Sequence, residues 1–169
     1  MITLGIDPGT ARMGWGIVEW KKKGRGGHFG LVNYGCLETA KETAMPARLW
    51  YLYKELRRLV KEYEPQEVVI ERLFFNSNAK TVMSVGQARG VAMLASAEKK
   101  LPLFEYTALE AKFILTGYGR AEKDEVCAKV RQLLSIREKI KIDDAADALA
   151  IALCHLLKNG TLHKDQRKS

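Results

Sequence analysis

Two kinds of hydrophobic pattern divide the chain into short and long elements. Short, mostly apolar segments predict β-strands over residues 2–7, 13–20, 28–38, 67–71 and 103–106. Longer segments predict helices between Pro46 and Pro65 and over residues 79–100, 107–115, 123–135 and 143–159. The first of these helices is the clearest, because apolar residues between Leu49 and Val60 recur at spacings of three and four.

The order of these elements predicts the fold class. Three strands come first, and the basic, glycine-rich segment KKKGRGG at residues 21–27 is expected to form a hairpin tip. Strands and helices then alternate, which predicts a mixed sheet with helices on its faces. We therefore expect one α/β domain over residues 1–158, with Gly160 ending the last helix and a disordered polar tail at residues 159–169.

Charge, cysteine content and hydropathy narrow the range of functions. The 169 residues carry a formal net charge of +8, and such an excess attracts polyanions such as nucleic acid. The three cysteines form no CxxC pair, which argues against a zinc site or a disulfide framework. The longest uncharged apolar run, residues 148–154, is too short to span a bilayer, and the opening MITLGID lacks the pattern of a secretory signal. We expect a cytoplasmic protein without a membrane partner.

The last predicted helix contains the strongest local anomaly. Every residue from Ala145 to Cys154 is apolar except Asp147, and a helix that is apolar all round is normally buried. A buried, unpaired carboxylate costs several kcal/mol or becomes protonated, so we expect Asp147 to face a cation. Asp144 and Asp143 precede it by three and four residues, which brings both within reach. For Asp143 a helix N-cap is the simpler interpretation.

Two predicted strands also end on an acid. Asp7 closes the first strand and Glu71 closes the strand VVIE, and acids at strand ends are held by a rigid sheet. Each has a simpler explanation when taken singly: Asp7 opens an ordinary Asp-Pro-Gly turn, and Glu71 could pair with Arg72.

Four converging carboxylates would sum to a charge of −4, which two divalent cations would balance. Oxygen ligands favour Mg²⁺ or Mn²⁺ over zinc. Paired cations serve phosphodiester hydrolysis, in which one activates water and the other stabilises the leaving oxygen. A basic chain with such a site is expected to cut nucleic acid.

Several segments, taken in order, resemble the RuvC family of Holliday junction resolvases, which belong to the RNase H-like superfamily. They are LGIDPGT…GWG (4–16), VVIERLFFNSNAKT (68–81), GQARGVA (86–92), FEYT (104–107), GYGRAEK (117–123) and DDAADALAIALCH (143–155). The resemblance implies an RNase H-like fold with a mixed five-stranded sheet, three antiparallel strands first, flanked by helices. It also implies that the catalytic and metal-binding acids are Asp7, Glu71, Asp144 and Asp147, and the match DAAD selects Asp144 over Asp143.

The resemblance extends to residues that would contact DNA. The family's stacking aromatic matches Phe74, and Lys112 and Lys123 match lysines near the active site. An aromatic face can stack on any unpaired base, whereas Phe75 is better explained by packing. Further candidates for phosphate contacts are Arg72, Lys80 and Arg89.

The resemblance implies structure-selective cutting of a four-way DNA junction by paired symmetric nicks, in homologous recombination and DNA repair. The implied cofactor is Mg²⁺, two ions per site, with Mn²⁺ able to substitute. The implied partners are a second copy of the chain and a branch-migration motor complex of the RuvA–RuvB type. Gly86 and Gly90 lie four apart in a predicted helix, which indicates close packing against the chain's own sheet or a second subunit.

Three alternatives differ in class. Actin-like ATPases and sugar kinases share the opening DxGT, but they need a second large domain, and the chain has no G-x4-G-K-[ST] loop. Another RNase H-like nuclease, acting on hybrids or as a transposase, would keep the chemistry and change the substrate; the segments GQARG and AEK argue against it. A junction-binding module that does not cut would tolerate loss of an acid, yet all four are present.

Overall fold

The computed structural model describes residues 1–24, 26–72 and 79–165. Five strands form one sheet: β1 (Ile2–Asp7), β2 (Arg12–Lys23), β3 (Gly26–Glu38), β4 (Glu67–Glu71) and β5 (Leu103–Tyr106). Five helices accompany it: α1 (Met45–Tyr63), α2 (Ala79–Glu98), α3 (Ala108–Thr116), α4 (Lys123–Leu133) and α5 (Asp143–Asp165). The strand order is β3-β2-β1-β4-β5, with β1, β2 and β3 antiparallel and β4 and β5 parallel to β1. The predicted mixed five-stranded sheet with its antiparallel start is confirmed.

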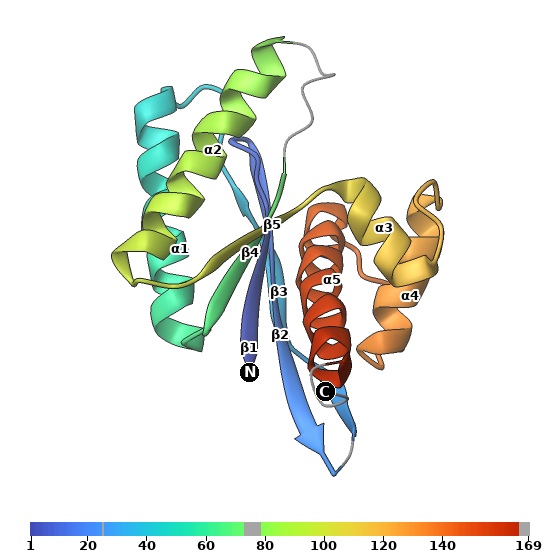
Figure 1. Cartoon of the computed structure of the whole chain (residues 1–169). Helices are drawn as coiled ribbons and strands as arrows, with labels where there is room; N and C mark the ends of the chain where they lie inside the picture. Colours follow the sequence, from blue (N-terminus) through green and yellow to red (C-terminus); the bar gives the residue numbers. More distant parts are fainter. Residues whose placement is uncertain (25, 73–78, 166–169) are drawn as a thin grey trace.

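The helices cover both faces of the sheet (Figure 1). Helices α1 and α2 lie on one face, and α5 lies on the other with α3 and α4 outside it. The strands alternate accordingly: Val68 and Ile70 of β4 pack with α1, whereas Val69 between them packs with Ile151 of α5. Because the central strands are buried on both sides, their sequences are apolar at nearly every position until they end at Asp7 and Glu71.

Three glycines let α5 lie unusually close to β1 and β2. A Cβ atom at Gly5 or at Gly14 would overlap with a backbone carbonyl oxygen of α5, from Ala148 and Asp144 respectively. At Gly16 it would meet the side chain of Leu149. The absence of side chains at these positions therefore fixes where the first turns of α5, with their acids, lie on the sheet.

Two predicted boundaries were wrong. The hairpin tip expected over residues 21–27 is shorter, because Lys21, Lys22 and Lys23 pair with His28, Gly27 and Gly26 and so extend both strands. Helix α5 does not end at Gly160 but continues to Asp165, so the expected disordered tail begins with helix. A glycine inside a helix costs about 1 kcal/mol relative to alanine, which weakens the helix without ending it. No helix in the described part of the chain is long and apolar enough to cross a membrane.

Candidate active site

Asp7 and Glu71 lie side by side where two parallel strands end. The preceding residues, Ile6 and Ile70, are register partners in β1 and β4. Burial, followed by the charges of Glu71 and Asp147, raises the pKa of Asp7 from its ordinary 3.8 to about 7. Burial and Asp147 also raise the pKa of Glu71, against which a hydrogen bond with Asp7 acts. Two carboxylates this close disfavour the state in which both are charged, and either a proton or a cation relieves that repulsion.

Asp147 joins this pair from the second turn of α5. Burial raises its pKa, and the neighbouring ammonium group of Lys123 opposes the shift. Lys123 is the first residue of α4, and its Nζ donates a hydrogen bond to Oδ2 of Asp147 at 3.1 Å. The expectation that Asp147 faces a cation is therefore met in the structure by a side chain of another helix.

A pocket with a volume of about 240 Å³ opens beside these groups. Its charged walls are Glu71, Asp147, Lys112 and Lys123. Its apolar walls are Ala108, Ala111, Val126, Ala150 and Ile151. Acids and lysines thus line one concave surface, as a site that holds a polyanion next to cations requires.

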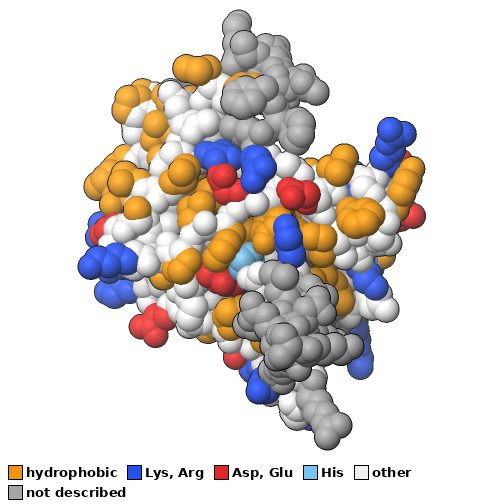
Figure 2. Space-filling model, viewed as in Figure 1, with side chains coloured by type: hydrophobic (Ala, Val, Ile, Leu, Met, Phe, Trp, Pro, Cys, Tyr) orange, Lys and Arg blue, Asp and Glu red, His pale blue; other side chains and the backbone are white. Residues whose placement is uncertain are grey.

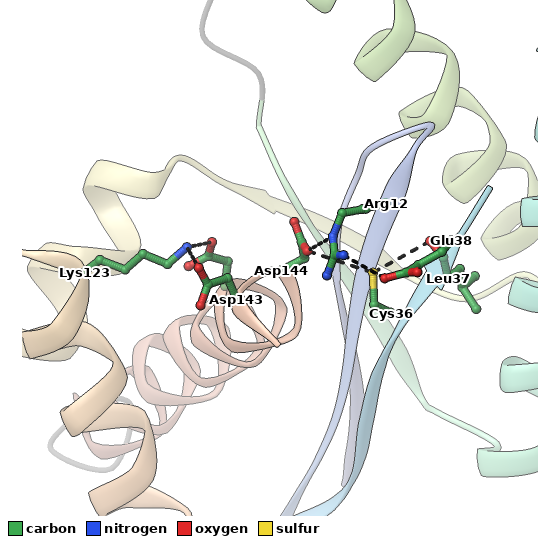
Figure 3. Close-up of polar contacts among 8 residues, drawn as sticks. Arg12, Cys36, Leu37, Glu38, Lys123, Asp143 and Asp144 are labelled. Atoms are coloured by element: carbon green, nitrogen blue, oxygen red, sulfur yellow. Dashed lines mark hydrogen bonds and ion pairs between the residues drawn. The ribbon is translucent and has the colours of Figure 1, made fainter. Parts of the chain in front are cut away.

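Asp144 pairs with a different cation from Asp147: Asp144 meets Arg12, and Asp147 meets Lys123. Oδ2 of Asp144 accepts a hydrogen bond from Nε of Arg12 at 2.6 Å, and Arg12 also pairs through Nη1 with Oε1 of Glu38 at 2.7 Å (Figure 3). On the other side of the helix start, Lys123 lies 3.7 Å from Asp143. The N-cap expected at Asp143 was wrong: Asp143 is the first helical residue, because the carbonyl of Ile142 already accepts the N–H of Ala146.

The carboxylate oxygens of these acids are of the kind that a hard divalent cation prefers. Their side chains are not arranged around a common point. Asp7 lies within electrostatic reach of Glu71, Asp147 and Asp144. Among the described residues, no three acidic, histidine or cysteine side chains are arranged so that they could hold a metal ion. Asp144 and Asp147 are paired instead with Arg12 and Lys123. Oxygen donors of this kind suit Mg²⁺, provided that both carboxylates leave those partners.

The other predicted site residues lie at varying distances from this centre. Lys112 donates from Nζ to the carbonyl of Ala121 at 2.8 Å, and Arg72 is exposed directly after Glu71. Arg89 pairs with Glu105 and donates to the backbone carbonyl of Glu71, so it supports the end of β4. Phe74, Phe75 and the side chain of Lys80 lie outside the described residues.

Sequence reasoning missed Arg12 as a neighbour of the acids. It begins β2, and 132 positions separate it from Asp144. A weak signal existed in the glycines that follow it, since Gly14 and Gly16 in an otherwise apolar strand indicate close approach by another element.

The model of the family described as crossover junction endodeoxyribonuclease RuvC matches residues 3–155. The chain belongs to the RuvC family. The RuvC of Desulfitobacterium hafniense (strain DSM 10664 / DCB-2) is 51% identical over 155 residues, which are 92% of each chain. That of Alkaliphilus oremlandii is 47% identical over the same shares of both chains. The resemblance stated from the motifs is thereby confirmed.

Solved structures agree with this RuvC assignment. Thermus thermophilus RuvC in complex with a Holliday junction substrate superposes with a TM-score of 0.88 at 30% identity, covering 95% of this chain and 96% of that one. The yeast mitochondrial Holliday junction resolvase shares the fold, with a TM-score of 0.67 at 14% identity over 95% of this chain and 80% of that one. The RNase H-like fold implied by the resemblance is confirmed.

Proposed function

We propose that this chain resolves Holliday junctions by paired symmetric nicks, in homologous recombination and DNA repair. The observation that carries the proposal is the convergence of Asp7, Glu71 and Asp147 in a chain that superposes, over 95% of its length, on a RuvC solved with a Holliday junction. We also propose that the protein acts in the cytoplasm, where it would meet DNA junctions.

The proposed cofactor is Mg²⁺, two ions held by Asp7, Glu71, Asp144 and Asp147, with Mn²⁺ able to substitute. When bound, such cations supply Lewis acidity that activates water and stabilises the leaving oxygen of a phosphodiester. The chain's own contribution is to hold the four acids at fixed points. Asp7 and Glu71 are fixed by strand ends, and Asp144 and Asp147 by the first turns of α5. The raised pKa of Asp7, about 7, supports the proposal, because a cation would replace the proton that burial favours there.

Basic side chains would hold the DNA against these acids. Lys112 and Lys123 line the pocket with Glu71 and Asp147, which supports phosphate contacts by both lysines. On the face shown in Figure 2, lysine and arginine side chains lie beside acidic ones instead of forming a separate basic patch. Arg72, Lys80 and Arg89 remain candidates for further phosphate contacts. Phe74 remains the candidate for base stacking.

A second copy of the chain is the proposed partner of α2. Among the described residues, no atom outside the helix's own backbone lies within 4 Å of a Cβ built at Gly86 or at Gly90, so these glycines do not serve packing on the described strands of the sheet. Met83, Met93 and Leu94 are exposed on the same side of the helix, at spacings of three and four from the glycines. An exposed apolar stripe with small residues suits two-fold association, which paired cuts on opposed strands require. A branch-migration motor of the RuvA–RuvB type is proposed as a further partner by family membership.

The test is cleavage of a labelled four-way junction beside linear duplex and RNA–DNA hybrid, with Mg²⁺ or EDTA. We expect paired nicks in the junction alone, abolished by EDTA. Asp147→Asn should reduce the rate at least about a hundredfold, the usual order for loss of a group that stabilises transition-state charge. Asp124→Asn, an exposed acid in the first turn of α4, is the matched control and should cut like wild type.

The alternatives predict different results in the same assay. If only the hybrid is cut, the proposed active site stands but the proposed junction substrate is wrong. The chain would then be another kind of RNase H-like nuclease. Tight junction binding without cutting in Mg²⁺ or Mn²⁺ would overturn the enzyme and leave a junction-binding module.

A further inference from the structure

Arg12 binds one of the four acids from outside the carboxylate cluster. Its Nε lies 2.6 Å from Oδ2 of Asp144, and its Nη1 lies 2.7 Å from Oε1 of Glu38 (Figure 3). The side chain of Asp144 is 29% exposed and that of Arg12 is 49% exposed. The guanidinium group therefore lies at the rim of the site, where it can reach Asp144 or turn into solvent.

The backbone determines that these two side chains meet. Arg12, the first residue of β2, is the register partner of Glu38, the last residue of β3. Gly14, two residues further along β2, allows the first turn of α5 to touch the strand at Asp144. The carboxylate of Asp144 is thus held over the beginning of β2, within reach of the side chain that starts it.

An arginine in this position competes with a divalent cation. Guanidinium stays charged at any accessible pH and only donates hydrogen bonds, so it occupies a lone pair of Oδ2 and repels a second cation there. Glu38 shares the guanidinium group, because Nη1 pairs with Oε1 of Glu38 while Nε pairs with Asp144. Cys36, whose Sγ lies 4.0 Å from Oδ2, offers no positive charge that could replace Arg12.

We propose that Arg12 is a positioning residue that competes with the divalent cation for Asp144, so that Asp144 becomes a cation ligand only when Arg12 releases it. The inference rests on the proposed role of Asp144 as a ligand. Arg12 then sets the cation concentration at which the fourth carboxylate joins the site.

The experiment measures Mn²⁺ binding to the full chain without DNA, by the electron paramagnetic resonance signal of the free ion. Arg12→Met removes the charge and keeps the length, and it should tighten Mn²⁺ binding by about threefold, the scale of a partly exposed ion pair. In an Asp144→Asn background the same change should leave the dissociation constant unaltered. Arg58→Met, which removes an exposed, ion-paired arginine of α1, is the control and should change nothing.

A second variant covers the case in which Arg12→Met does not fold. Glu38→Gln keeps Arg12 and removes the second acid that shares its guanidinium group, which leaves Asp144 as the only acid paired with Arg12, so it should weaken Mn²⁺ binding, again only where Asp144 is present. If the Arg12 and Glu38 substitutions act equally in both backgrounds, or if Arg12→Met weakens binding, the competition is overturned. If Asp144→Asn alone binds Mn²⁺ as tightly as wild type, the ligand role of Asp144 fails, and with it this part of the proposed function.

Discussion

The backbone of Gly14 in β2 lies directly against the carbonyl oxygen of Asp144 in α5. A Cβ atom at position 14 would overlap with that oxygen and with the carbonyl carbon. The obstacle is backbone and not the end of a flexible side chain, so a larger residue could be accommodated only if the first turn of α5 moved. That turn carries Asp144, and Asp147 follows three residues later.

Gly14→Ala should therefore impair both stability and cleavage. Insertion of a methyl group against a fixed backbone costs about 1–3 kcal/mol, and the shift of α5 would misplace two of the four proposed ligands. Urea unfolding and junction cleavage measure the two effects. Gly30→Ala is the control, because a Cβ there would lie 3.9 Å from the carbonyl of Glu19, an ordinary contact. Wild-type cleavage by Gly14→Ala would mean that the position of α5 is less critical than its packing indicates.

Asp7→Asn should be more stable than wild type in EDTA at pH 8. The pKa of Asp7 is raised in the folded chain from 3.8 to about 7, so the folded state binds this proton more tightly than the unfolded state. The resulting stability is fully present below about pH 4 and is lost as the pH rises through about 7. Asparagine carries no charge, so the variant does not lose this stability as the pH rises. We expect the melting temperature of Asp7→Asn at pH 8 to exceed that of wild type by about 3 °C or more.

Two observations would check that this difference arises from the charge of Asp7. The two proteins should melt at similar temperatures at pH 3, where Asp7, with its ordinary pKa of 3.8, is mostly protonated in the unfolded as well as the folded state. Addition of Mg²⁺ at pH 8 should stabilise wild type and have little effect on Asp7→Asn, because the proposed ligand is lost. Equal melting temperatures at pH 8 in EDTA would contradict the raised pKa.

The elements that carry the acids could be predicted from the sequence because their signals are local. A buried strand that ends on a carboxylate is visible in ITLGID and VVIE, and the single acid in DALAIALC stands out within its helix. The structure has all three elements, and it brings Asp7, Glu71 and Asp147 together. Resemblance was needed to select Asp144 over Asp143, and to favour a ligand role for Asp7 over an ordinary turn and for Glu71 over an ion pair with Arg72.

The cations that face these acids could not be predicted in the same way. No lysine or arginine follows Asp147 within the next two turns of its own helix, and its partner Lys123 comes from α4. Arg12 meets Asp144 only because β2 and α5 touch at a glycine. Such contacts depend on tertiary packing between distant segments, which the spacing of residues along one element does not encode.

Lys123→Met should weaken binding to the junction. It should also make that binding less dependent on salt concentration. If Lys123 contacts a phosphate, its removal lowers the slope of log K against log salt concentration by about 1. Fluorescence anisotropy in EDTA measures this slope without cutting. Lys54→Met is the matched control, since Lys54 is exposed on α1, which packs on the other side of the sheet from α4. An unchanged slope for Lys123→Met would restrict the role of Lys123 to its contact with Asp147.

Gly90→Leu should convert the proposed dimer into a monomer while favouring the helical state of α2. Leucine favours a helix over glycine by about 1 kcal/mol, and in the part of the chain that the structure describes no atom beyond the helix's own backbone lies within 4 Å of the added Cβ. A second copy packed closely on α2 would be displaced by the larger side chain. Light scattering after size-exclusion chromatography gives the mass, and urea unfolding gives the stability. Lys61→Leu, near the end of α1, controls for an added surface leucine.

Gly90→Leu also tests whether paired cutting depends on the association of two copies, separately from the chemistry of each cut. A monomeric Gly90→Leu keeps all four acids, so it should still nick one strand of a junction at high protein concentration. The second nick would then no longer be coupled to the first, and singly nicked junctions should accumulate. If Gly90→Leu remains dimeric and cuts in pairs, the two copies associate through a surface other than this face of α2.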